Sequence, residues 1–306
     1  MAHRVYIDGH AGTTGLRIRE WLADREDLTL ATLDEAQRKD PQARREQIAA
    51  ADIALLCLPD DAAREAAEWA SEGGTRVLDT STAHRVADEW VYGLPELGPD
   101  QRKAIGQAAR VSNPGCYPSG FILATRPLID AGLLAPATPL SFHALSGYTG
   151  GGRPMIEKWE NPATPLSELA YAAPYALDQV HKHVPEMVRY SGIKCEPQFL
   201  PAVGPFRCGM RIQIPLHADS LQSGTQAKHL WEALEARYRD EAFVHLHPLA
   251  EPGASDEYTF DPTACNDTNR IELHVVPHPA GHVLLVAVLD NLGKGASGVA
   301  IQSLNL

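Results

Sequence analysis

Short apolar runs alternate with polar, helix-compatible stretches along the first third of the chain. The run at 52–58 is apolar almost throughout, as is typical of a parallel strand that is buried on both faces. Between the runs, residues 16–23 are helix-compatible, and the alanine-rich stretch 61–71 predicts a helix that ends at two glycines. This alternation predicts a doubly wound parallel sheet of the Rossmann type. The predicted strands are residues 4–8, 28–33, 52–58, 76–80 and 109–112.

The pattern changes after about residue 134, where strand-like runs become longer and follow one another at hairpin-like spacing. They predict an α+β domain with a mostly antiparallel sheet and a helix at 225–238. Residues 146–154 and 161–174 are predicted to be loops, and 293–304 a final helix that packs back on the first domain. The predicted strands are residues 139–145, 199–203, 210–216, 271–276 and 283–289.

The fold class that follows is α/β, with a Rossmann-type domain and a second α+β domain. We assign residues 1–116 and 291–306 to the dinucleotide-binding domain and residues 117–290 to the second domain. A chain of 306 residues with 44% hydrophobic positions is long enough for two cores.

Charge and cysteine content exclude several function classes. The net charge of −12 argues against a nucleic-acid-binding protein, which needs a basic face. The longest apolar stretches are too short to span a membrane, so we expect no membrane partner. Five cysteines without a CxxC pair, and a strand that starts almost at once, lead us to expect a reducing, cytoplasmic location without a signal peptide.

A GxxGxxG turn lies between the first predicted strand and the first predicted helix. Its members Gly9, Gly12, Thr13, Thr14 and Gly15 would let a pyrophosphate approach the backbone N–H groups of the helix N-terminus. We therefore predict a nicotinamide dinucleotide site at this turn.

The residues after the second predicted strand leave the choice of nucleotide open. Asp34 stands where an acid would bind the ribose of NAD, whereas Arg38 and Lys39 could hold the 2′-phosphate of NADP. A solvated loop is the competing interpretation of all three. We also assign Pro59, which follows the third predicted strand, to the cofactor site.

Cys116 lies in a sharp turn at 112–120, before the predicted helix 121–134. Pro114 and Gly115 favour the turn, and Pro118 suits the first turn of a helix. A thiol at a helix N-terminus faces unpaired N–H groups and the positive end of the helix dipole, which favour the reactive thiolate and an oxyanion next to it. We predict that Cys116 is a nucleophile; the alternative is an inert, buried cysteine.

His181 and His183 form a second group of candidate catalytic residues. Histidine is the usual proton shuttle near neutral pH, so we predict a proton-transfer role for one of the two. On a strand their spacing would place them on one face, where they could bind a metal, but no third ligand has a convincing spacing. We therefore predict no metal; further histidines at 245–247 and 274–282 are predicted to be structural or exposed.

Two further segments are candidates for binding an anionic substrate. Arg85 follows the fourth predicted strand, at the ligand-binding edge of such a sheet, and its guanidinium could clamp a phosphate. Ser146 and Gly147 open a glycine-rich segment whose N–H groups could wrap an anion. A surface salt bridge and a plain loop are the respective alternatives.

Four motifs together resemble a known family. The ordered set resembles the N-acetyl-gamma-glutamyl-phosphate reductase family of arginine biosynthesis, in its shorter subtype, over nearly the whole chain. The four motifs are the GxxGxxG turn, Asn-Pro-Gly-Cys-Tyr-Pro at 113–118, His-Lys-His-Val-Pro-Glu at 181–186 and Asp-Asn-Leu-Gly-Lys-Gly-Ala at 290–296.

The resemblance implies an enzyme that uses NADP(H) and forms a homo-oligomer, a dimer or a tetramer. It would reduce N-acetyl-glutamyl 5-phosphate, a small acyl phosphate, to N-acetylglutamate 5-semialdehyde and phosphate through a cysteine thioester. The roles implied are nucleophile for Cys116, acid or base for His181, substrate contact for His183 and Glu186, phosphate contact for Arg85, and nicotinamide contact for Asn291.

Other functions stay open at the level of the sequence. The same chemistry could act on aspartyl phosphate or on a carrier-bound aminoadipyl phosphate, because the residues that would read the N-acetyl group are unassigned. A nucleotide-binding protein without catalysis and a zinc hydrolase are alternatives of other classes.

Overall fold

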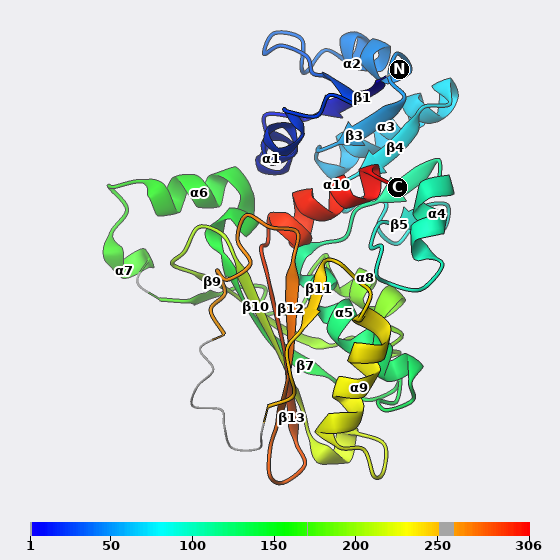
Figure 1. Cartoon of the computed structure of the whole chain (residues 1–306). Coiled ribbons are helices and arrows are strands. Elements are labelled where there is room, and N and C mark those ends of the chain that lie inside the picture. Colours follow the sequence, from blue (N-terminus) through cyan, green and yellow to red (C-terminus); the bar gives the residue numbers. More distant parts are fainter. Residues whose placement is uncertain (1, 170, 251–259) are drawn as a thin grey trace. The chain divides into compact units, whose positions relative to one another are not determined.

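A computed structural model describes residues 2–169, 171–250 and 260–306 of the chain (Figure 1). The chain divides into two compact units. The first unit contains Met1–Pro114 together with Ala296–Leu306, and the second contains Gly115–Gly295. Among the described residues, no helix is long and apolar enough to cross a membrane.

The first unit is built on a six-stranded sheet in which every pairing is parallel, which confirms the predicted doubly wound sheet. The strand order is β2-β1-β3-β4-β6-β5, so the winding direction reverses between β1 and β3. A crevice at the carboxyl ends of such strands is the usual ligand site of this fold. The strands are β1 His3–Asp8, β2 Leu28–Ala31, β3 Ile53–Leu56, β4 Arg76–Asp79, β5 Val91–Tyr92 and β6 Arg110–Ser112.

Helices cover both faces of this sheet. Because successive side chains of a strand point to opposite faces, Val5 and Ile7 join one core with Ala300 of the C-terminal helix, whereas Tyr6 joins the other. The helices are α1 Thr13–Leu22, α2 Pro41–Ala49, α3 Asp60–Gly73, α4 Gln101–Gln107 and α10 Gly298–Leu304.

Two of these helices were not predicted. In α2, Arg44 and Ile48 are the buried residues, and in α4 Ile105 is, so neither sequence shows an apolar stripe. The start of α2 did carry a signal, since the Asp40 carboxylate caps the helix by accepting from the Gln42 N–H at 3.1 Å.

The second unit contains a seven-stranded mixed sheet in the order β11-β12-β13-β10-β7-β9-β8. Four of its six pairings are antiparallel, in agreement with the prediction, and two are parallel. The strands are β7 Ser141–Gly147, β8 Ala173–Pro174, β9 Gln198–Gly204, β10 Met210–Leu216, β11 Val244–Leu246, β12 Ile271–Pro277 and β13 Val283–Leu289.

Two long helices lie on one face of this sheet (Figure 1). Helix α5 (Cys116–Asp130) packs on β13 and β10, and α9 (Ala227–Tyr238) packs on β11 and β12. Close contact at Gly120 lets α5 approach the sheet, because Ile212 and Leu289 fill the space where a side chain would stand. The remaining helices are α6 Gly152–Glu160, α7 Leu166–Leu169 and α8 Val184–Ser191.

Several predicted boundaries were wrong. Helix α5 begins at Cys116 rather than at residue 121, and the predicted loop 146–154 contains a 3-10 turn and the start of α6. No residue of α6 is buried, so its sequence lacks the apolar stripe that would have revealed it. The final segment is not one helix, because a π-helical turn at Gly293–Ser297 precedes α10.

Replacing Gly120 tests how closely α5 packs on its sheet. A Cβ atom at this position would lie 2.5 Å from Ile212 Cδ1 and 3.3 Å from Leu289 Cδ2. We expect Gly120→Val to lower the free energy of unfolding by about 2 kcal/mol through overpacking, as measured by urea denaturation. Gly98→Val is the control, since no atom lies within 4 Å of the added Cβ. Equal effects of the two substitutions would contradict the packing explanation.

Candidate active site

Cys116 is the first residue of α5, so its thiol lies at the helix N-terminus. The N-cap residue is Gly115, which provides no side-chain cap. The first turn of α5 thus presents backbone N–H groups and the positive end of the helix dipole, an arrangement that favours negative charge on a nearby sulfur or oxyanion. The cysteine is partly exposed, as a nucleophile must be.

Glu186 holds the turn that carries Cys116. Its Oε2 accepts a hydrogen bond of 3.0 Å from the Gly115 N–H, and its side chain is 1% exposed. Glu186 lies in the first turn of α8, so this bond joins the starts of two helices. The structure therefore gives this predicted substrate residue a contact with the backbone next to the nucleophile.

Gly295, which lies in a π-helical turn, packs directly against Cys116. A Cβ atom at Gly295 would lie 2.6 Å from Cys116 Cβ, and the Gly295 N–H is fixed by a 2.9 Å bond to the Asp290 carbonyl. A larger residue at position 295 would therefore displace Cys116. This steric contact explains why the motif at 290–296 has a glycine at position 295.

His181 and His183 lie in a turn before α8, not on a strand, so the strand interpretation was wrong. The proline at the second helical position of α8 explains the difference, because it favours a helix start just after His183. The two rings are 4.7 Å apart, and both contact the ring of Tyr117, the neighbour of Cys116. The structure thus brings the second motif to the cysteine turn.

A backbone hydrogen bond sets the proton position on His181. The His183 N–H donates to His181 Nδ1 at 3.1 Å, which requires Nδ1 to be unprotonated. The neutral ring then carries its proton on Nε2 and presents it as a hydrogen-bond donor. Among the described residues, one group of three side chains could bind a metal ion, and neither His181 nor His183 belongs to that group.

Two tyrosines that the sequence analysis missed belong to the same site. The Tyr175 hydroxyl donates to the Tyr117 hydroxyl at 2.9 Å, and the Tyr175 ring lies 5.8 Å from that of His181. Burial raises the pKa of Tyr117 well above its usual value, with a further contribution from Tyr175, so Tyr117 is neutral. The sequence signal that could have revealed Tyr117 was its position next to Cys116.

Asn291, Ser146 and Gly147 meet at the glycine-rich segment. The Asn291 side chain accepts from the Gly209 N–H at 2.8 Å and donates to Thr149 Oγ1 at 2.9 Å. Gly147 permits close chain approach, because a Cβ there would lie 2.5 Å from the Arg207 carbonyl oxygen. These residues form a buried frame within the second unit, in which the Ser146 hydroxyl donates to the Gly147 carbonyl at 3.1 Å.

In the first unit, the glycine turn lies at the carboxyl ends of β1 and β3. Gly9 has a φ of +85°, and a Cβ there would lie 2.2 Å from the Cys57 carbonyl oxygen, so this position requires glycine. A Cβ at Gly15 would lie 2.5 Å from the Gly9 carbonyl oxygen. Gly12 is the N-cap of α1 and provides no side-chain cap, and a helix N-terminus of this kind can bind an anion through the N–H groups of its first turn.

Basic side chains lie beside this turn. Burial lowers the pKa of His10, and the charges of Arg19 and Arg38 lower it further. Arg38 forms a 2.5 Å ion pair with Glu35, and the Asp34 carboxylate accepts from the Gln37 N–H at 2.9 Å. Asp34 therefore stabilises its own turn, and the charge of Arg38 is paired with that of Glu35. Pro59 precedes α3 at the end of β3.

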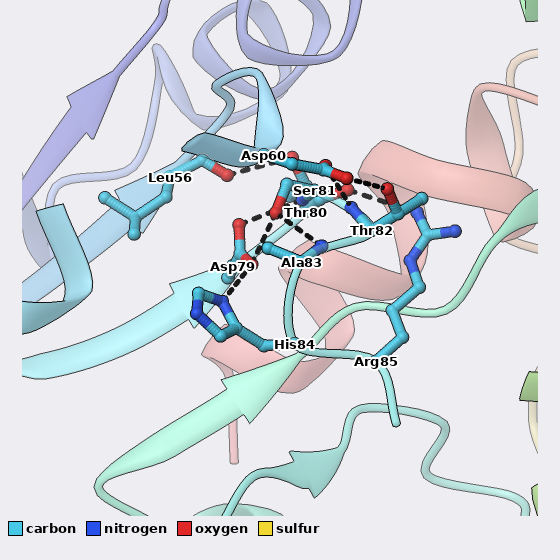
Figure 2. A network of polar contacts seen from close by, with 9 residues as sticks. All are labelled: Leu56, Asp60, Asp79, Thr80, Ser81, Thr82, Ala83, His84 and Arg85. Atoms are coloured by element: carbon cyan, nitrogen blue, oxygen red, sulfur yellow. Dashed lines mark hydrogen bonds and ion pairs between the residues drawn. The ribbon is translucent and has the colours of Figure 1, made fainter. Parts of the chain in front are cut away.

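Arg85 belongs to a buried polar network after β4 (Figure 2). The Asp79 carboxylate accepts from the Ser81 N–H at 2.9 Å and the Ser81 hydroxyl at 2.7 Å, and pairs with His84 Nδ1 at 2.7 Å. Arg85 is 8% exposed and donates to the Thr80 carbonyl at 3.2 Å. The sequence analysis missed the roles of Asp79 and His84, although Asp79 ends the strand.

Selective alkylation tests which thiols are reactive. Burial raises the pKa of Cys57 to about 12 and that of Cys265 to about 11, so fewer than about one in a thousand of either is thiolate at pH 7.5. We expect iodoacetamide to modify Cys116 and the exposed Cys195 and to spare Cys57 and Cys265, as measured by peptide mass spectrometry. In urea all should react. Labelling of folded Cys57 as fast as Cys195 would contradict this expectation.

Two family models match most of the chain. The model described as "Semialdehyde dehydrogenase, NAD binding domain" matches residues 4–105. The model described as "Semialdehyde dehydrogenase, dimerisation domain" matches residues 116–291.

Full-length relatives and solved structures agree with these matches. A Pseudomonas putida protein named N-acetyl-gamma-glutamyl-phosphate reductase 2 is 49% identical over 303 residues, 99% of this chain and 96% of the relative. A Nostoc protein of the same name is 44% identical over 309 residues, again 99% and 96%. Aspartate semialdehyde dehydrogenase II from Vibrio cholerae has the same fold, with a TM-score of 0.75 at 17% identity over 100% of this chain and 98% of that one. The Francisella tularensis aspartate semialdehyde dehydrogenase also has a TM-score of 0.75, at 14% identity over 100% of this chain and 99% of that one.

Proposed function

Because this chain belongs to the semialdehyde dehydrogenase family, among the N-acetyl-gamma-glutamyl-phosphate reductases, we propose that it reduces N-acetyl-γ-glutamyl phosphate to the 5-semialdehyde and phosphate. The position of Cys116 at the uncapped N-terminus of α5 carries the proposal, since this reaction needs a thiolate next to N–H donors. The cofactor is NADP(H), and the reaction belongs to arginine biosynthesis.

The reaction begins at Cys116. Its thiolate attacks the acyl carbon, the tetrahedral oxyanion collapses, and the carbon–oxygen bond to phosphate breaks to leave a thioester on Cys116. When bound, NADPH supplies the hydride that reduces this thioester. Hydride addition leaves a thiohemiacetal oxyanion, whose collapse breaks the carbon–sulfur bond, releases the aldehyde and restores the thiolate.

In this scheme His181 stabilises two oxyanions, the one formed when Cys116 attacks the acyl carbon and the one formed when hydride reduces the thioester. The backbone bond at Nδ1 leaves the Nε2 proton as the donor, so we assign His181 to hydrogen-bond the oxyanion rather than to accept a proton. His183, whose ring contacts that of Tyr117, and Ser146 would line the substrate side. Asn291, whose amide is held by Gly209 and Thr149, would contact the nicotinamide through its second amide N–H.

The first unit has the features that the cofactor requires. Its glycine turn leaves room for a pyrophosphate at the N-terminus of α1, and Arg38 would bind the 2′-phosphate. Pro59 would border the nucleotide from the end of β3. Arg85, held by the network at Asp79, would bind the substrate phosphate through its guanidinium.

The family also supports a proposal about the assembly and the cellular location of the protein. We infer that the second unit forms a homo-oligomer, either a dimer or a tetramer, as the name of its family model suggests. We also infer that the enzyme works in the cytoplasm. Residues 1–116 with 291–306 would bind cofactor, and residues 117–290 would provide catalysis and assembly.

An assay in the reverse direction tests the reaction and its nucleophile. We expect phosphate-dependent reduction of NADP⁺ with N-acetylglutamate semialdehyde, followed by NADPH absorbance, and little turnover with aspartate semialdehyde or with NAD⁺. Cys116→Ser should lower turnover by at least about 1000-fold while NADP⁺ binding is retained. Turnover with aspartate semialdehyde would identify aspartyl phosphate as the substrate instead. Turnover by the serine variant would exclude Cys116 as the nucleophile.

Substitutions of Glu186 test whether it positions the nucleophile. Glu186→Gln keeps an oxygen for the Gly115 N–H, whereas Glu186→Ala leaves this buried donor without a partner. We expect the alanine variant to lose kcat by roughly 100-fold with little change in KM, and the glutamine variant to recover most of that loss. If both variants raised KM equally without lowering kcat, Glu186 would instead contact the substrate directly.

A further inference from the structure

One edge of the sheet in the second unit carries a cluster of histidines and a carboxylate that the proposed reaction does not use. Strands β11 and β12 pair in parallel there, with His245 opposite Glu272. The pairing continues past the end of β11, because the His247 N–H donates to the Leu273 carbonyl at 2.9 Å. Alternate residues of a strand share a face, so His245, His247, Glu272 and His274 all project from the same side.

Three of these side chains converge. The potential ligand atoms of His247, Glu272 and His274 all lie within 4.8 Å of one another. His247 Nε2 is 3.3 Å from Glu272 Oε2, and this buried nitrogen makes no hydrogen bond. The rings of His247 and His274 are 4.0 Å apart, and that of His245 is 4.6 Å from His247.

We propose that His247, Glu272 and His274 form a binding site for a divalent transition-metal ion, Zn²⁺ in the first instance. Two imidazoles and one carboxylate are a known ligand set for this ion, with a fourth position left for water or a further side chain. At a Zn–N distance of about 2.1 Å, tetrahedral ligand atoms lie about 3.4 Å apart, so ligand atoms up to 4.8 Å apart must approach one another by as much as about 1.4 Å.

The surroundings orient these three groups. Arg270 donates to Glu272 Oε1 at 2.8 Å, which directs the other carboxylate oxygen toward His247. The Trp231 indole N–H donates to the His247 carbonyl at 2.8 Å and fixes the backbone of that ligand. Phe260 lies edge-on to His274, with ring centroids 5.0 Å apart. Such outer contacts are what metal ligands need to keep their orientation.

The expected consequence is structural. Strand β11 is at the edge of its sheet and is three residues long, so one backbone ladder holds it to β12. A metal bound between His247 and the two β12 ligands would join the strands a second time. This inference does not depend on the proposed reaction, and its test requires no substrate.

Zinc titration of chelator-treated protein tests the site. The protein should carry Cys116→Ser, so that the reactive thiol does not compete for the metal. We expect one Zn²⁺ per chain in isothermal titration calorimetry and a higher Tm with zinc. His274→Gln in the same background should weaken binding by more than about 100-fold and abolish the rise in Tm.

His217→Gln is the matched control, since His217 also contacts another histidine, His282, at a ring distance of 4.2 Å. It should bind zinc as tightly as its parent. Circular dichroism of the metal-free variants checks folding, and Glu272→Gln replaces His274→Gln if that variant does not fold. No stoichiometric binding by the parent, or equal binding by the test and control variants, would overturn the proposal and leave Glu272 as an ordinary partner of Arg270.

Discussion

The hydrogen bond from the Gly115 N–H to the buried Glu186 carboxylate is the contact on which the catalytic geometry depends. It fixes the turn that places Cys116 at the start of α5, and it orders α8, just after the two histidines. A carboxylate near a helix N-terminus is also favoured by the helix dipole, so the same contact stabilises the fold. Removing it would leave a buried donor unsatisfied beside the nucleophile.

The second constraint at this site is steric. Gly295 contacts Cys116 where no side chain fits, and Asn291 ties the neighbouring chain segments together through both ends of its amide. The sulfur therefore has the helix N–H groups on one side and a packed turn on another. Tyr117 completes the arrangement by contacting both histidine rings.

Both units place their chemistry at an uncapped helix N-terminus. In the first unit, Gly9 and Gly15 allow the chain to turn tightly from β1 into α1, which begins without a side-chain cap. In the second, α5 begins in the same way at Cys116. In the proposed reaction, the N–H groups of the first helical turn would stabilise a pyrophosphate in the first unit and an oxyanion in the second.

The sequence by itself determined the fold class and the main chemical groups. Continuous apolar runs predicted the parallel strands, because strands buried on both faces contain few polar residues. Glycine spacing predicted the nucleotide turn, and the Pro-Gly-Cys-Tyr-Pro turn predicted a reactive cysteine. These signals are local, so a single chain segment contains all the information needed.

The tertiary structure decided which distant residues meet. That Glu186 binds Gly115, that Tyr175 bonds Tyr117, and that His247 faces Glu272 depend on packing between segments far apart in the chain, which no local pattern encodes. Helix α6 buries no residue and α2 buries few, so their sequences lacked the apolar stripe by which helices are recognised. The sequence could therefore name the reactive groups, whereas their mutual positions depend on close packing of the whole unit.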